Sequence, residues 1–183
     1  MTNTLLNFFN LFPVPVPEPV TDRPLEIKVP EPDVSFEIEV FNAVNRHRIG
    51  LRLPPLKLVS EISDIARKHS QWLCDTDYWS GKIGHSGFAK RAEEVRQLKF
   101  KEIRENLGTA QILEHHYKTV QSRRSITELM LAKWIASTEG HREAIEEVES
   151  TYTGIGVVSH PAHDEDGNSG FVIYVTQLFA RSR

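Results

Sequence analysis

The spacing of apolar residues after residue 33 predicts a first helix. Apolar positions from 35 to about 51 share one side of such a helix; they are Val40, Phe41, Val44 and Leu51. The polar residues Asn45, Arg46 and Arg48 fall largely on its other sides. Pro54 and Pro55 forbid its continuation, because proline lacks an N–H and clashes with the preceding turn.

A second helix is indicated by a stripe at spacings of i, i+3, i+4, i+7 and i+11. The stripe consists of Ile62, Ile65, Ala66, His69 and Leu73. We expect His69, which lies within it, to be a core histidine with its hydrogen bonds satisfied rather than a ligand. A loop rich in Gly, Ser and aromatic residues follows at 75–88, and then a polar helical stretch from Ala89 to Leu98.

Residues 102–148 show patterns typical of both strands and helices. Residues 102–110 are typical of a strand, and residues 114–124 of an irregular segment. Ser125 and Glu128 match a capping box, which predicts a helix beginning there. Its predicted buried face consists of Ile126, Leu129, Met130 and Trp134. Gly140 interrupts this helix, and one or two further turns are expected from His141 to about Val148.

The chain finishes with two β-branched and aromatic runs, at 153–160 and 170–180. Residues 162–169 between them carry turn chemistry, so we expect an antiparallel hairpin with a long loop. Helices followed by a terminal hairpin predict an α+β domain in which helices pack on a small sheet.

Composition divides the chain into an arm and a domain. Seven of the ten prolines fall between residues 13 and 32, which predicts a flexible, extended arm over residues 1–33 and a single domain over 34–183. The first apolar run has no basic residue before it, so we expect no cleaved signal peptide there.

Charge and cysteine content narrow the class of protein. With a net charge of -3 and a pI near 6.2, the chain lacks the overall positive charge typical of nucleic-acid-binding proteins, so we expect no nucleic-acid partner. No apolar run in the sequence approaches the ~18 residues that a membrane-spanning helix needs. The lone cysteine, Cys74, forms no intrachain disulfide, and we expect it to be a buried thiol. A turn at Asp164, Asp166 and Asn168 resembles the start of a calcium loop but lacks its glycine and glutamate, so we interpret it as a polar tip.

Several short motifs, in a fixed order across about residues 36–180, carry a family resemblance. They are VNRHRIGLRLPPL (44–56), GHSGF (84–88), ENLG (105–108), WIASTEGHR (134–142), TGIGVV (153–158) and YVTQLF (174–179). In this order the chain resembles the CAP superfamily of cysteine-rich secretory, antigen 5 and pathogenesis-related proteins, and its prokaryotic SCP-like branch most of all. The resemblance implies an α-β-α sandwich with helices on both faces of a small antiparallel sheet.

The resemblance also implies a cleft that holds two histidines and two acids. Position by position, these are His85, Glu105 and His141, with Ser137 where many relatives carry glutamate. One extra residue in the 137–141 spacing leaves Glu139 as the other candidate for the fourth position. Two neutral imidazoles suit Zn²⁺, Cu²⁺ or Ni²⁺, so we expect His85 and His141 to bind a divalent metal, zinc among them.

The role of Glu105 stays open between three chemistries. Glu105 is able to ligate the metal, orient an imidazole, or act as general base on bound water. A Glu–His pair is equally able to cross-link loops, and we expect Asn106 to serve the backbone. His115 and His116 are interpreted as part of a solvated loop, with an accessory metal site or a surface for an anionic partner as the alternative.

Three functional hypotheses follow. The first is a binding or envelope-associated module that takes an unidentified ligand in its cleft. The second is a metal-dependent hydrolase that uses His85, His141 and Glu105, and the third is a structural or interaction protein with a relic site. The resemblance favours an extracellular or cell-envelope location, although the N-terminal pattern leaves a cytoplasmic one open. The sequence assigns no oligomeric state.

Overall fold

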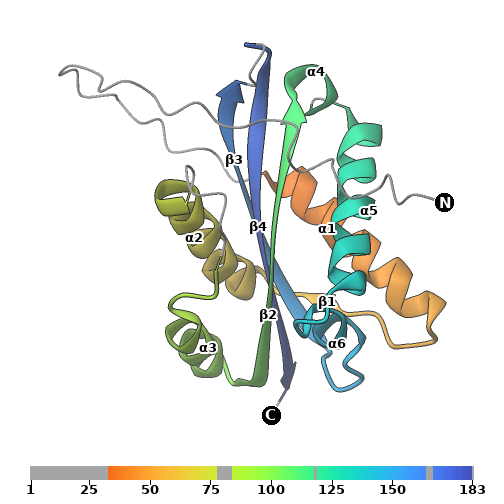
Figure 1. Ribbon diagram of the computed structural model, residues 1–183. Coiled ribbons are helices and arrows are strands. Elements are labelled where there is room, and N and C mark those ends of the chain that lie inside the picture. The colour runs from red at the N-terminus through yellow and green to blue at the C-terminus, as the bar shows by residue number, and fades with distance from the viewer. Residues whose placement is uncertain (1–32, 78–83, 118, 164–166, 183) are drawn as a thin grey trace.

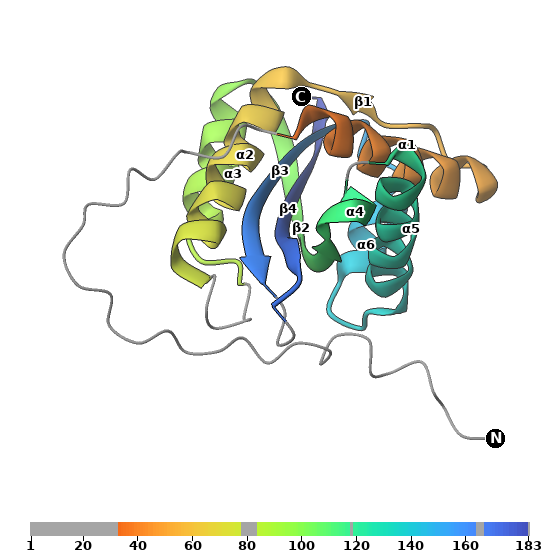
Figure 2. The same cartoon turned by 90° about the horizontal axis from the view of Figure 1, so that it is seen from above.

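A computed structural model describes residues 33–77, 84–117, 119–163 and 167–182, which form a four-stranded sheet between two layers of helices (Figure 1). The helices are α1 (Val34–Gly50), α2 (Ser60–Asp77), α3 (Phe88–Gln97), α4 (Glu114–Tyr117), α5 (Val120–Ala136) and α6 (His141–Glu146). Seen from above, α2 and α3 cover one face of the sheet, whereas α1, α5 and α6 cover the other (Figure 2). The expected α-β-α sandwich is therefore confirmed. The proline-rich arm lies outside the described residues.

The sheet has the order β1-β3-β4-β2. Its strands are β1 (Lys57–Leu58), β2 (Phe100–Leu113), β3 (Tyr152–His163) and β4 (Ser169–Ser182). β4 pairs antiparallel with β3 and with β2, which confirms the terminal hairpin, and β1 pairs parallel with β3. The strand expected at 102–110 is longer than predicted and forms one edge of the sheet. Asp164 and Asp166 of the calcium-like turn lie outside the described residues.

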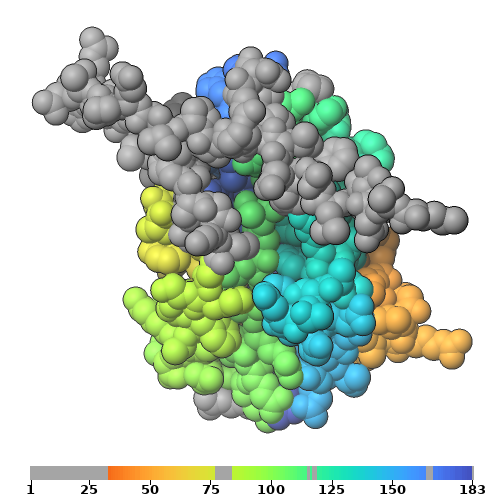
Figure 3. Space-filling model, in the orientation of Figure 1, coloured from red at the N-terminus to blue at the C-terminus, as the bar shows by residue number. Residues whose placement is uncertain are grey.

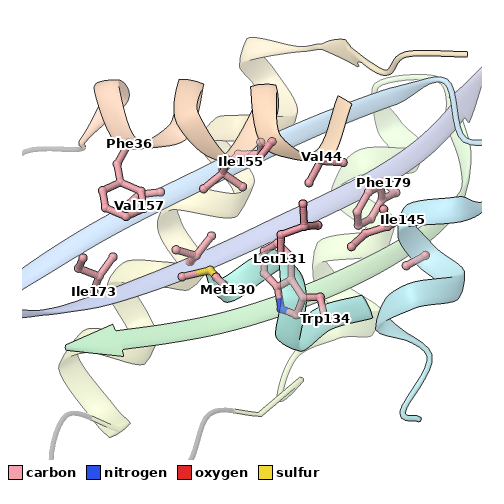
Figure 4. Packing of buried hydrophobic residues seen from close by; sticks show 14 of the residues in the cluster. Phe36, Val44, Met130, Leu131, Trp134, Ile145, Ile155, Val157, Ile173 and Phe179 are labelled. Carbon is pink, nitrogen blue, oxygen red and sulfur yellow. The ribbon is translucent and has the colours of Figure 1, made fainter. Parts of the chain in front are cut away.

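Both faces of β4 are buried, and the strand's alternation divides its side chains between the two helical layers. Ile173, Val175 and Phe179 belong to the core cluster under α1, α5 and α6. Val172, Tyr174 and Leu178 belong to clusters under α2 and α3. Figure 4 shows the first cluster, where side chains of α1 and α5 meet those of β3 and β4. A strand that is apolar on both faces requires helices on both sides.

Helix α2 approaches β3 closely at two glycines. A Cβ at Gly154 would lie 2.3 Å from a backbone atom of Ile62, and one at Gly156 would lie 2.1 Å from a backbone atom of Arg67. No side chain fits at either position, so the TGIG motif allows α2 to pack backbone against backbone on the sheet. The apolar stripe of α2, with His69 inside it, is buried as predicted.

The predicted faces of α1 need correction at Arg48 and Leu51. Arg48 is fully buried, because it continues the row of Val40 and Val44 at i+4 spacing. Leu51 caps the helix and is 49% exposed. The buried guanidinium is satisfied by backbone carbonyls: it donates to the oxygens of Pro54, Ile145, Glu147 and Ser150.

The start of α5 also differs from the prediction. The helix begins at Val120, where the Thr119 hydroxyl accepts from the Ser122 N–H, so Thr119 rather than Ser125 caps it. Ser125 lies inside the helix and donates to the Gln121 carbonyl. Within the segment expected to be irregular, residues 114–117 form α4 and residues 120–124 already belong to α5. Leu129, expected on the buried face, is 51% exposed.

Replacement of Arg48 by Met tests the role of the buried guanidinium. Arg48→Met leaves four backbone carbonyl oxygens, in α6 and in the loops after α1 and α6, without this donor, and we expect the free energy of unfolding to fall by roughly 3 kcal/mol. Urea denaturation measures it. The control is Arg46→Met, which removes an exposed ion pair with Glu128 and should cost less than about 1 kcal/mol. Equal effects in the two variants would contradict this role.

Candidate functional site

The predicted site residues meet at the outer edge of β2. His85 precedes α3 in one helical layer, and His141 is the first residue of α6 in the other. Between them, β2 contributes Glu105. In the space-filling view, the surface of β2 is visible between the α3 side and the α5–α6 side (Figure 3). The fold thus brings His85, Glu105 and His141 together from three separate elements.

The buried carboxylate of Glu105 contacts the imidazole of His85. The Glu105 side chain is 1% exposed, and its Oε1 lies 2.9 Å from Nδ1 of His85, whose own side chain is 49% exposed. The same carboxylate is paired with Arg91 of α3, which donates Nε to Oε2 at 2.7 Å and Nη2 to Oε1 at 2.6 Å. Because a carboxylate only accepts hydrogen bonds, this contact favours the neutral tautomer of His85 with the proton on Nδ1 and the lone pair on Nε2.

Ser137 holds His141 in a corresponding way. Ser137 caps the C-terminus of α5, and its hydroxyl oxygen lies 3.0 Å from Nδ1 of His141. The same oxygen accepts from the backbone N–H of Glu139 at 3.1 Å. Gly140, at a φ of 88°, reverses the chain and opens α6 at His141. Of the two candidates for the fourth position, Ser137 contacts the imidazole, whereas Glu139 is exposed.

The ENLG motif ties both layers to the edge strand. Successive residues of β2 point to opposite faces, so Glu105 reaches His85 while Asn106 donates its amide to the His141 carbonyl at 3.0 Å. Asn106 thus serves the backbone, as expected. The next carbonyl, of Leu107, accepts from the Trp134 indole N–H, and a Cβ at Gly108 would lie 2.6 Å from the sulfur of Met130. The motif therefore fixes the position of α5 and α6 relative to His85.

The two imidazoles face one another across the edge of the sheet. Their ring centroids lie 6.1 Å apart, with an angle of 37° between the ring planes. Burial, and to a smaller extent the neighbouring His85, lowers the pKa of His141, whereas Glu139 and Glu143 raise it. The net lowering keeps His141 neutral at pH 7, so its imidazole has a lone pair to offer a cation.

The donor set suits a metal held by two imidazoles. Two imidazoles that share a zinc ion at ~2.0–2.1 Å have ring centroids about 5–6 Å apart, close to the separation found. Glu105 is committed to Arg91 and His85, and no group of three His, Cys, Asp or Glu side chains in the described part of the chain is arranged around a common point. Among the described residues, the two imidazoles are therefore the donors that this site would offer a metal, fewer than the three or four protein ligands of most zinc sites.

His69 lies beneath the site, and its environment differs from the prediction. It is 3% exposed and makes an edge contact with Trp72, but neither ring nitrogen has a hydrogen-bond partner among the described residues. Burial, with a smaller effect of the Arg91 charge, lowers the pKa of His69 to about 4. His69 is thus a buried core histidine, as expected, but an unsatisfied one.

Other candidate groups lie apart from this site. Cys74 is buried, as predicted, and burial raises the pKa of its thiol to about 11, so it is no nucleophile at neutral pH. His115 and His116 belong to the short helix α4 rather than to a loop. Sequence reasoning missed Arg91 altogether. The sequence feature that could have indicated Arg91 is its place six residues after His85, in the predicted helix that follows the Gly- and Ser-rich loop.

The fold and the paired histidines define a class of protein, and the comparison of sequences gives the family. The profile of the cysteine-rich secretory protein family, called CAP, matches residues 41–179. The chain therefore belongs to the CAP family. No curated protein matches the sequence significantly.

Solved structures of bacterial proteins share the fold. An outer surface protein of Borrelia burgdorferi has a TM-score of 0.52 and 16% identity over 84% of this chain and 99% of its own. An extracellular protein of Bacillus anthracis that contains an SCP domain has a TM-score of 0.54 and 20% identity over 80% of this chain. A cysteine-rich secretory protein of Staphylococcus aureus has a TM-score of 0.52 and 16% identity over 90% of this chain. The chain spans 40% and 42% of the last two proteins.

None of the helices in the described residues combines the length and the apolar character needed to cross a membrane.

The depressed pKa of His69 predicts a pH-dependent stability. The unfolded chain binds a proton at this residue below about pH 6.5, whereas the folded chain binds it only near pH 4. The contribution is fully present above pH 6.5 and is lost as the pH falls toward 4. Between pH 7 and pH 5, the free energy of unfolding of the wild type should fall by roughly 2 kcal/mol more than that of His69→Phe. Urea denaturation at the two pH values measures this difference, and an equal fall in both proteins would contradict it.

Proposed function

We propose that this CAP domain is a binding module that takes a divalent transition metal between Nε2 of His85 and Nε2 of His141. The observation that carries the proposal is the pairing of each Nδ1 with an oxygen, Glu105 for one histidine and Ser137 for the other. Histidines that bind metals usually make this kind of contact through their second nitrogen, because it fixes the ring and directs the free lone pair outward.

The charges around the site support a cation. Arg91 and Glu105 neutralise one another, so the arginine presents no unopposed positive charge to the metal. On the other side, Glu139 and Glu143 stabilise positive charge at His141. Imidazole donors favour Cu²⁺, Ni²⁺ and Zn²⁺ over Mg²⁺ and Ca²⁺, which prefer oxygen ligands. Zinc or copper is therefore the proposed metal, and calcium is not.

Binding is favoured over hydrolysis by the state of Glu105. A general base must accept a proton from water, but both oxygens of this buried carboxylate already accept from Arg91 and His85. Glu105 is therefore proposed to orient His85 rather than to activate a nucleophile. When bound, the metal supplies a Lewis-acidic centre with exchangeable positions, which are suited to a ligand donated by a partner.

We propose an extracellular or envelope-associated setting for this module. The support is the family together with two similar structures whose names describe an outer surface protein and an extracellular protein. The proline-rich composition of residues 1–32 suits a spacer between the domain and an attachment point.

Titration of the metal-stripped protein with Zn²⁺ by calorimetry tests the proposal. We expect one site of about micromolar affinity, near -8 kcal/mol, because two imidazoles bind more weakly than three or four ligands. In the double variant His85→Ala/His141→Ala, this binding should disappear while the thermal unfolding temperature stays within a few degrees of the wild type.

The matched control is His160→Ala, which removes a partly exposed histidine of β3 away from the site. It should bind zinc as the wild type does. Equal binding by the double variant and the control would show that the two histidines have no part in it, and absence of binding by the wild type would leave the site with a structural role only.

A further inference from the structure

We propose that Arg91 is the positioning residue of this site, and that its two-pronged contact with Glu105 sets which nitrogen of His85 faces outward. The contact is built from two parallel hydrogen bonds, of 2.7 Å and 2.6 Å, to the two oxygens of one carboxylate. Arg91 touches neither imidazole in the contacts described above. Its effect on the site is therefore transmitted by Glu105.

The guanidinium connects three separate segments. Arg91 itself belongs to α3, and Glu105 belongs to β2. A third donor, Nη1, binds the backbone carbonyl of Ser86 at 2.7 Å, in the loop that carries His85. The same side chain thus fixes both the loop before α3 and the carboxylate that the histidine meets.

The loop is shaped to admit this side chain. Gly87 adopts a φ of 73°, a conformation that L side chains rarely adopt. A Cβ at this position would lie 3.2 Å from Nη1 of Arg91. Glycine therefore permits both the turn after His85 and the close approach of the guanidinium. Arg91 is itself mostly buried, with 11% of its side chain exposed.

The pairing decides the tautomer of the neutral histidine. A carboxylate whose two oxygens are held by Arg91 is fixed in one orientation, and Oε1 is then directed at Nδ1 of His85. This keeps the proton on Nδ1 and the lone pair on Nε2. Without Arg91, this buried carboxylate keeps His85 as its one described side-chain partner, so it is free to reorient. The preference of the His85 imidazole for the Nδ1–H tautomer is then lost.

The first arm of the test uses metal-free protein and is independent of the proposed metal. Nitrogen-15 NMR of the imidazole rings, at about pH 8.5 and so roughly two units above the ordinary histidine pKa, reports the neutral tautomer. Wild-type His85 should be predominantly the Nδ1–H tautomer. In Arg91→Gln it should shift toward the Nε2–H form, and in Arg91→Lys, which keeps the charge but not the fork, it should lie between the two.

The matched control is Arg96→Gln, an arginine of the same helix whose partner Glu93 is exposed; it should leave the tautomer unchanged. If the tautomer of His85 is the same in wild type and both Arg91 variants, the proposal is wrong. Because Arg91→Lys retains the charge, it carries the test if Arg91→Gln does not fold.

The second arm rests on the proposed function and measures zinc affinity by calorimetry. Arg91→Gln should bind Zn²⁺ about 10–100-fold more weakly than wild type, as is usual when a residue that orients a metal ligand is lost. Zinc affinity equal to or above that of wild type would overturn the positioning role. If wild type binds no zinc while the tautomer shifts in Arg91→Gln, the metal site is refuted and the positioning role stands.

Discussion

The rest of the molecule depends on the burial of both faces of β4. Because its alternate side chains are apolar on either side, helices must cover the sheet twice, and the site is a consequence of that arrangement. The two layers end at the edge strand β2 from opposite directions. Each contributes one histidine there, His85 before α3 and His141 at the start of α6. Residues 56 positions apart therefore become neighbours without any local sequence relation.

The buried carboxylate of Glu105 imposes the second constraint. An ionised group in this position is tolerated only if its oxygens are paired, and Arg91 and His85 supply all the partners described. Adjacent residues of β2 therefore have different roles. Glu105 orients the imidazole on one face, while Asn106 holds the backbone of His141 on the other. Under the proposed function, the chemistry of the site is that of the two imidazole nitrogens rather than of a free acid.

Much of this could be predicted from the sequence, and the failures have physical causes. The stripe of α2 and the terminal hairpin follow from periodicity. The short motifs around His85, Glu105 and His141 indicated the family and three residues that the fold brings together at the edge of β2. Arg48 was misplaced because charge was taken to mean exposure, although four carbonyls satisfy it inside. Arg91 was missed because its partner lies fourteen residues away across the α3–β2 connection, which only the fold closes. The prediction of a capping box at Ser125 failed because Thr119 offers an earlier cap.

The central claim is that His85 and His141 bind a metal through their Nε2 atoms while Glu105 keeps its hydrogen bonds to Arg91. A crystal structure of the zinc-loaded protein, with anomalous diffraction recorded on both sides of the zinc absorption edge, tests it most directly. The account predicts one anomalous peak within ~2.0–2.1 Å of both Nε2 atoms, with the Glu105–Arg91 pair intact. Zinc bound elsewhere, or bound by an oxygen of Glu105 that has left Arg91, would contradict it.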